Sequence, residues 1–186
     1  MDIDKLAKCG KVRYFNADSF IVIEGNEGST AFLVLKGFVG VVLGTFKDKN
    51  RIVARIDEGS FFGEMSMLEG APRSATVMAG GGGVTVLEIG KDDFLKLMKT
   101  EPELAFKLLK TLYNRIEDTL NGSDRYMVAY AAEVRRDKTY KEISAIDLDQ
   151  FKVIVAQRED YVLKLLTYMS HTLTKINREL MRRTSM

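Results

Sequence analysis

Short apolar runs recur along the first half of the chain, from about residue 12 to residue 90. Each run is rich in β-branched residues, which is typical of β-strands, and the segments EGNEGS, KDKNR and GGGG between them predict turns. The runs are FIVI at 20–23, FLVL at 32–35, VGVVLG at 39–44, RIVARI at 51–56, ATVM at 75–78 and VTVLEI at 84–89. We therefore expect an antiparallel sandwich or barrel, with Gly80–Gly83 as a flexible hairpin turn.

The hydrophobic pattern changes at Lys91, where apolar residues begin to recur at helical spacing. A short helix is predicted around Phe94, and Pro102 lies near the first turn of a longer helix, where proline is tolerated. Gly122 is a natural end for that helix. The long helix carries its apolar residues at Leu104, Leu108, Leu112, Ile116 and Leu120.

The remainder of the chain, 123–186, contains no glycine and no proline, which favours helices joined by polar links. We therefore predict two domains, 1–122 and 123–186, the second a helical extension for dimerisation or partner binding. Apolar residues there alternate steps of four and three, the pattern of a helix that packs along one stripe. They are Val162, Leu166, Met169, Leu173, Ile176 and Leu180. Such a stripe contacts either a second chain or the barrel of the same chain. We expect a homodimer through helices.

One part of the helical extension weakly repeats an earlier part of the chain. The segment ISAIDLDQFKVIV followed by VLKLL is similar to VLEIGKDDFLKLM followed by AFKLL at one fixed offset. The aligned pairs are Ile89 with Ile146, Asp92 with Asp149, Phe94 with Phe151, Lys107 with Lys164, Leu108 with Leu165 and Leu109 with Leu166. Two amphipathic helices rich in lysine and leucine can resemble each other by chance. A true repeat would copy a helical pair without the strands that precede it.

Composition excludes several classes of protein. Of the 186 residues, 46% are hydrophobic and 29% charged, which is ordinary for a globular protein. The formal net charge of +2 provides no global attraction to nucleic acid or an anionic membrane. The single Cys9 forms no internal disulfide, and MDIDKLAKCGKV does not have the pattern of a signal peptide. We expect a cytoplasmic protein without a membrane segment.

The segment EGSFFGEMSMLEGAPRSATV, residues 58–77, concentrates the chemistry. At Gly63 the missing Cβ lets a ligand approach the amides of Glu64, Met65 and Ser66, which can form a concavity for an anion. Arg73 has a planar, permanently charged fork that suits a phosphate. Glu64 is a good acceptor for a sugar hydroxyl. The alternative is an ordinary surface turn with an exposed salt bridge of little energy.

The stretch FGEMSMLEGAPRSATV resembles the phosphate-binding cassette of cyclic-nucleotide-binding domains. That module is shared by catabolite-activator-type bacterial regulators, regulatory subunits of cyclic-nucleotide-dependent kinases and gated channels. IEGNEGSTAFLVLKGFV at 23–39 is similar to the opening hairpins of the family, and the resemblance covers roughly residues 10–122. It implies an α+β fold, an antiparallel β jelly-roll barrel with hinge and lid helices, followed here by the helical extension.

The resemblance also implies roles for individual residues. Glu64 would accept the ribose 2′-hydroxyl, and Arg73 would pair with the cyclic phosphate. Gly63 and Ser66 would provide backbone contacts, while Ser74 and Ala75 would close the phosphate cradle. The remaining implied contacts are the base pocket at Val41 and Val53, a brace for the cassette glutamate at Arg115, and the purine edge at Thr119.

The expected function is a regulatory protein that senses a cyclic nucleotide, cAMP or alternatively cGMP, and signals through its lid helix to the tail. No cofactor, metal or catalytic residue is expected, because His171 is the only histidine and has no cluster of ligands around it in sequence. The downstream protein is not named by the sequence. One alternative is a DNA-binding transcription regulator, although the tail has no glycine-bearing recognition turn or wing. Another is a barrel that no longer binds nucleotide.

Overall fold

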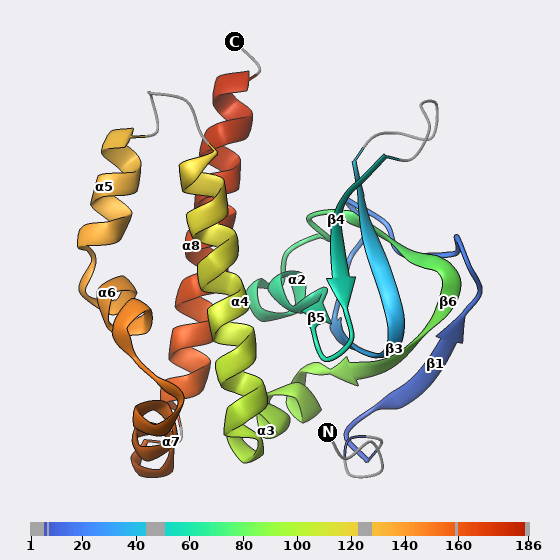
Figure 1. Cartoon of the computed structure of the whole chain (residues 1–186), viewed down its shortest axis with the longest axis horizontal. Coiled ribbons are helices and arrows are strands. Elements are labelled where there is room, and N and C mark those ends of the chain that lie inside the picture. Colours follow the sequence, from blue (N-terminus) through green and yellow to red (C-terminus); the bar gives the residue numbers. More distant parts are fainter. Residues whose placement is uncertain (1–5, 7, 44–50, 123–127, 159, 185–186) are drawn as a thin grey trace. The chain divides into compact units, whose positions relative to one another are not determined.

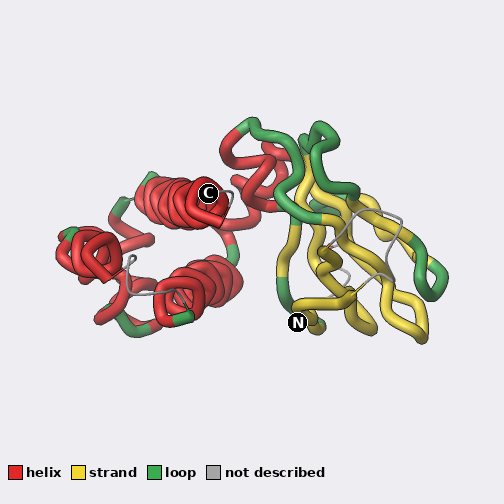
Figure 2. Tube along the Cα trace, turned by 90° about the horizontal axis from the view of Figure 1, so that it is seen from above, coloured by secondary structure: helices red, strands yellow, loops and turns green. Residues whose placement is uncertain are grey.

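The chain forms two compact units, Met1–Leu97 and Met98–Met186, in a computed structural model. The structure describes residues 6, 8–43, 51–122, 128–158 and 160–184. The first unit is built mainly of strands and contains helical residues at 64–69 and 91–97, whereas the described elements of the second unit are all helices (Figure 2). The boundary predicted at residue 122 marks the expected end of a ligand-binding module. The division into compact units does not test where that module ends, so this boundary stays a prediction.

The first unit is an antiparallel sheet (Figure 1). Its strands pair in the order β1-β6-β3-β4, with β2 also paired to β6 and β5 to β3. Their bounds are β1 Lys11–Phe15, β2 Phe20–Val22, β3 Thr30–Leu43, β4 Arg51–Asp57, β5 Phe61–Phe62 and β6 Thr76–Gly90. The predicted antiparallel β fold with C-terminal helices is confirmed. Among the described residues, the pairing is an open path from β1 to β4 and not a closed ring.

Two long strands replace four of the predicted short ones. FLVL and residues 39–43 of the next run both lie in β3, while residues 76–78 and VTVLEI both lie in β6. The prediction that Gly80–Gly83 forms a hairpin turn is therefore wrong, because these glycines continue β6. They form a bulge instead: Val39 pairs with Ala79 and Gly37 with Val84, so β6 carries extra residues between them. The two strands also approach closely there, since a Cβ at Gly37 would lie 2.7 Å from the carbonyl oxygen of Gly83.

Alternate residues of these strands form the core of the sheet unit. The rings of Phe32 and Phe62 stack with their centroids 4.9 Å apart. The buried cluster consists of Val22, Phe32, Val34, Val39, Ile56, Phe62, Val77, Ala79, Val84 and Val86. It draws on five strands, so the sheet curves around one shared apolar interior that positions the loops at its ends.

The helices agree with the pattern predicted from Lys91 onward. They are α3 Lys91–Thr100, α4 Pro102–Asn121, α5 Val128–Arg136, α6 Lys138–Ala145, α7 Leu148–Gln157 and α8 Tyr161–Thr184. Pro102 is at the start of α4 and Gly122 is its C-cap, as predicted. Within the second unit α4 packs against α6, α7 and α8.

The apolar stripe predicted in the tail lies on α8. Five of its residues are buried, namely Val162, Leu166, Met169, Leu173 and Ile176. α8 packs along α4 of the same chain. The two predicted alternatives, a second chain or the barrel, did not include this contact. No comparison tests the predicted homodimer through the helices.

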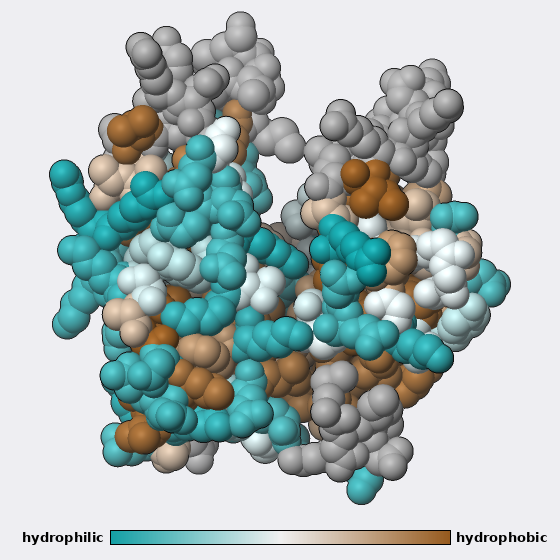
Figure 3. Space-filling view, viewed as in Figure 1, coloured by the Kyte–Doolittle hydropathy of each residue, from teal (hydrophilic) through white to brown (hydrophobic). Residues whose placement is uncertain are grey.

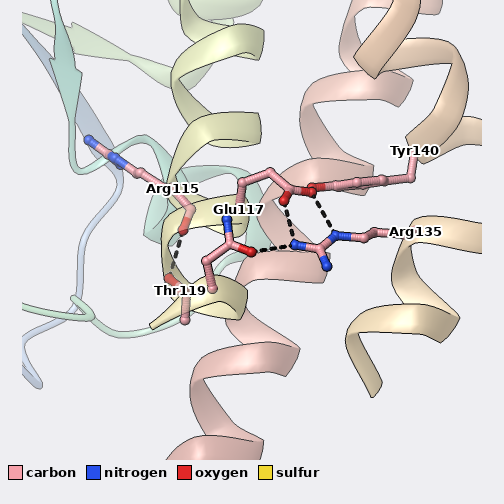
Figure 4. Close-up of polar contacts among 6 residues, drawn as sticks. Arg115, Glu117, Thr119, Arg135 and Tyr140 are labelled. Carbon is pink, nitrogen blue, oxygen red and sulfur yellow. Dashed lines mark hydrogen bonds and ion pairs between the residues drawn. The ribbon is translucent and has the colours of Figure 1, made fainter. Parts of the chain in front are cut away.

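Tyrosine hydroxyls paired with carboxylates are a recurring feature of the helical unit. Tyr140 donates to Glu117 at 2.7 Å, and Glu117 also pairs with Arg135 at 2.6 Å (Figure 4). Tyr161, which is 7% exposed, donates to Glu142. Burial, together with this hydrogen bond to a carboxylate, raises the pKa of Tyr161 to about 12.

We expect alkaline pH to destabilise the helical unit through Tyr161. The folded state holds the phenolic proton more tightly than the unfolded chain, in which the pKa is about 10. The resulting stabilisation, at most about 3 kcal/mol, is complete below pH 10 and is lost as the pH rises toward 12. Urea unfolding followed by circular dichroism should show this loss, and Tyr161→Phe should reduce it. Tyr14→Phe, at an exposed position on β1, is the control. Equal pH dependence in the parent and Tyr161→Phe would contradict the assignment.

Candidate ligand-binding site

The candidate site is one loop that connects β5 to β6 and contains the short helix α2, Glu64–Glu69. A left-handed glycine bounds the helix at each end. Gly63 is the N-cap with φ 73°, and Gly70 is the C-cap with φ 63° and donates its amide to the carbonyl of Ser66. Because only glycine adopts this conformation readily, the spacing of the two glycines limits the helix to its six residues.

The Arg73 side chain turns into the protein and is held by oxygen atoms of two segments. Its residue is 7% exposed. Nη1 donates to the carbonyl oxygens of Thr30 at 2.7 Å and Gly63 at 2.8 Å, while Nη2 donates to Thr30 Oγ1 at 3.2 Å. The bonds fix the plane of the guanidinium and use three of its five N–H donors. Arg73 is therefore oriented by the fold and retains donor capacity for an anion.

Two glycines provide the space for this side chain. A Cβ at Gly28 would lie 2.1 Å from Arg73 Nε, and one at Gly63 would lie 2.6 Å from Nη1. The backbone of Arg73 is fixed as well: its amide donates to the carbonyl of Asn26 at 2.8 Å, and its carbonyl accepts from the amide of Gly25 at 2.9 Å. The turn before β3 thus holds the backbone of Arg73, while Thr30, the first residue of β3, and Gly63 hold its side chain.

Two opposite charges are buried in this loop. Glu64 is 1% exposed, so the alternative of an exposed turn with a surface salt bridge is wrong. Burial lowers the pKa of Arg73, while Glu64 and then Glu88 act in the opposite direction. The guanidinium stays charged at neutral pH, because an arginine pKa begins far above it. A fixed cation that suits phosphate and a carboxylate that suits a hydroxyl therefore occur together in one loop.

The other predicted contacts in the first unit lie in or beside this loop. Met65 and Ser66 are buried in α2, whereas Ser74 is exposed and Ala75 partly exposed. Val41 lies in β3 and pairs with Val77, two residues after Ala75. Val53 lies in β4, and its side chain is outside the described part of the structure. The structure thus joins Val41 to the strand that continues from the loop, and every role assigned by resemblance stays a prediction.

Arg115 and Thr119 lie on α4, in the second unit. Thr119 Oγ1 donates to the carbonyl oxygen of Arg115 at 2.6 Å. The Arg115 side chain extends from the side of α4 opposite to Glu117 (Figure 4). The predicted contacts of Arg115 and Thr119 with the loop would join residues of different units, and they stay predictions.

Sequence reasoning missed the residues that orient Arg73. Thr30, Gly28 and Asn26 lie more than 40 residues before it, and only the fold brings them together. The spaced glycines of EGNEGST were a signal, because closely spaced glycines can mark a place where another group approaches the backbone. Nothing in the local sequence indicates that the approaching group is the side chain of Arg73.

No group of three or more His, Cys, Asp or Glu among the described residues is arranged to hold a metal ion. None of the helices in the described part combines the length and apolar character needed to cross a membrane.

A family model described as the cyclic nucleotide-binding domain matches residues 12–101. Human cGMP-dependent protein kinase 2 is 30% identical over 138 residues, which are 72% of this chain and 16% of the kinase. The cAMP-activated global transcriptional regulator CRP of Salmonella typhimurium is 27% identical over 109 residues, 58% of this chain and 51% of that protein. The chain thus spans at most about half the length of these relatives.

Solved structures share the fold. A transcriptional regulator from Thermotoga maritima matches with a TM-score of 0.51 and 24% identity, covering 60% of this chain and 86% of the other. A cAMP-binding acyltransferase from Mycobacterium smegmatis matches with a TM-score of 0.52 and 22% identity, covering 63% of this chain and 36% of the other. At these identities the likeness concerns the fold alone.

Proposed function

Because residues 12–101 of this chain belong to the cyclic nucleotide-binding domain family, we propose that the protein senses a cyclic nucleotide through the loop from Gly63 to Ala75. The phosphate binds at Arg73 and the ribose 2′-hydroxyl at Glu64. In this proposal the protein is a cytoplasmic regulator and not an enzyme, and the nucleotide is its ligand rather than a cofactor.

The observation that carries the proposal is the oriented Arg73. A flexible surface arginine loses side-chain entropy when it binds an anion, whereas three hydrogen bonds already hold this guanidinium in one plane. The nearby amides of α2 and the exposed Ser74 hydroxyl offer further donors to the same anion. The carboxylate of Glu64 repels an anion but accepts a hydrogen bond from a hydroxyl, so the pair fits a ligand with one anion and one sugar.

We propose cAMP as the ligand, with cGMP as the alternative that every titration includes. The human relative is a cGMP-dependent kinase, and the Salmonella relative is a cAMP-activated regulator. The hydroxyl of Ser74, directly after Arg73, is compatible with the adenine of cAMP and with the guanine of cGMP. The choice therefore rests on the sequence resemblance to cAMP-binding bacterial regulators.

Ligand binding is proposed to reach the helical unit through α4. This helix follows α3 after one residue and is packed by α6, α7 and α8, so a shift of α4 must alter those contacts. The partner that responds to this change is a protein of unknown identity. DNA binding is not favoured, because the described elements after α4 are all helices and include no hairpin wing.

Hydrogen exchange on the full chain tests sensing and transmission together. Saturating cAMP or cGMP should slow exchange in 63–76 and change it in 102–121 and 161–184. Protection of the loop alone would contradict transmission. An unchanged exchange profile with both nucleotides, on protein freed of bound ligand, would contradict sensing.

The proposed contact between Glu64 and the ribose 2′-hydroxyl predicts that a substitution at Glu64 weakens only the binding of ligands that have this hydroxyl. Loss of one charge-assisted hydrogen bond costs about 1.5–3 kcal/mol, so Glu64→Gln should weaken cAMP binding roughly 10- to 100-fold. The same substitution should hardly affect binding of 2′-deoxy-cAMP, which has no hydroxyl for Glu64. Calorimetric titration of both ligands into both proteins gives the comparison. Equal losses for the two ligands would show that Glu64 does not contact the 2′-hydroxyl.

A further inference from the structure

Two pairs of helices in this chain have the same layout. α3 is Lys91–Thr100 and α7 is Leu148–Gln157, so their first residues and their last residues are both 57 positions apart. Each is followed closely by a long helix, α4 or α8. The weak sequence repeat therefore coincides with a repeat of helix boundaries, which chance similarity between two amphipathic helices does not require.

The buried faces of α4 and α8 correspond at the same offset. Five positions of α4 and their counterparts in α8 are all buried: Ala105 with Val162, Leu108 with Leu165, Leu109 with Leu166, Leu112 with Met169, and Ile116 with Leu173. Lys107 and Lys164, aligned by the same offset, are both exposed. The two helices thus present equivalent apolar stripes on equivalent faces.

These stripes belong to helices that pack against each other and run in the same direction (Figure 1). Two parallel copies packed through equivalent faces are the arrangement that a two-fold axis along the helices produces in a homodimer. Here the copies belong to one chain. The face of the helical unit visible in Figure 3 is mostly hydrophilic, in keeping with stripes that cover each other.

Contacts from α6 and α7 hold this arrangement within the chain. Lys152 of α7 pairs with Glu103 of α4 at 2.7 Å, and the rings of Phe151 and Phe106 lie 5.3 Å apart. Lys110 of α4 donates to the carbonyl of Ile143 near the end of α6 at 2.8 Å. α4 is therefore bound on more than one side by residues of its own tail.

We propose that α7 and α8 are an internal copy of α3 and α4, and that α8 covers in cis the apolar face of α4 that a second copy of the chain would otherwise cover. The chain then has no helix-mediated homodimer, because its tail occupies that surface. The partner that fits the α4 stripe is α4 of a second copy, which gains access only when α8 leaves. This inference does not depend on nucleotide binding.

Spin labels on the 186-residue chain test this proposal. In a Cys9→Ser background, Lys107→Cys and Lys164→Cys place labels at exposed, equivalent positions of α4 and α8. Pulsed electron resonance on the doubly labelled chain should give one distance that persists when labelled chains are diluted with unlabelled ones. Loss of that distance on dilution, or an intermolecular distance with the Lys107→Cys label alone, would overturn the proposal.

A variant of the α8 stripe tests what the α4 face accepts. Met169→Asp places a charge in the buried stripe and should release α8, so that the Lys107→Cys label alone now gives an intermolecular distance and the mass in solution doubles. Thr167→Asp, at an exposed position two residues away, should change neither. A folded Met169→Asp protein that stays monomeric would refute the claim that α4 suits a second copy. If it does not fold, the dilution measurement on the parent chain decides.

Discussion

Replacing Arg73 with alanine is expected to weaken cyclic-nucleotide binding at least 100-fold, about 2.7 kcal/mol or more. The guanidinium is the oriented cation of the loop, and charge-assisted bonds to a phosphate contribute roughly 1.5–3 kcal/mol each. The same change removes hydrogen bonds to Thr30 and Gly63 and should lower the free energy of unfolding by about 1–3 kcal/mol. Calorimetric titration and urea unfolding measure the two effects.

Two further variants separate the ligand effect from the folding effect. Arg73→Lys keeps the charge but loses the planar fork, so its affinity should fall between those of the parent and the alanine variant. Arg178→Ala, at an exposed position of α8 outside the loop, should bind nucleotide as the parent does. A folded Arg73→Ala protein that binds either nucleotide with parental affinity would exclude Arg73 as the phosphate partner.

Adding one methyl group at Gly28 is expected to weaken nucleotide binding without touching the ligand. In Gly28→Ala the new Cβ would lie 2.1 Å from Arg73 Nε, which forces the guanidinium out of its position. Such overpacking costs typically about 1–3 kcal/mol of stability, and we expect affinity to fall roughly 10-fold or more as Arg73 shifts. The same calorimetric and unfolding experiments detect both changes.

A double-mutant cycle shows whether Gly28 acts through Arg73. Once Arg73 is alanine, Gly28→Ala has no side chain to displace and should cost little further stability or affinity. Gly81→Ala is the matched control, because nothing lies within 4 Å of a Cβ there. Additive losses in the Gly28→Ala/Arg73→Ala protein would show that Gly28 is required for another reason.

The apolar pattern predicts the class of fold, but it misplaces turns that depend on distant partners. Glycines normally separate strands, so GGGG predicts a hairpin. In the structure these glycines form a bulge within β6, because β3 pairs with β6 on both sides of them, at Ala79 and at Val84, and local sequence does not reveal this partner. The helices after Lys91 were predictable, since their spacing, Pro102 and Gly122 are all local signals.

The candidate site was likewise only partly predictable from the sequence. Gly63, Glu64 and Arg73 are recognisable because they lie in one short stretch with a family pattern. The environment of Arg73 is not, because Thr30 and Gly28 contribute through tertiary contacts across more than 40 residues. In the tail, the stripe of α8 was predictable, yet its burial against α4 of the same chain required the structure.

Titration of cAMP and of cGMP into the 186-residue chain, freed of bound nucleotide, decides whether it binds a cyclic nucleotide. We expect saturable binding of one nucleotide with a dissociation constant in the micromolar range or below, about 8 kcal/mol of binding free energy. If demonstrably empty, folded protein binds neither nucleotide, the claim is contradicted, and the loop around Arg73 holds the fold together without sensing a ligand.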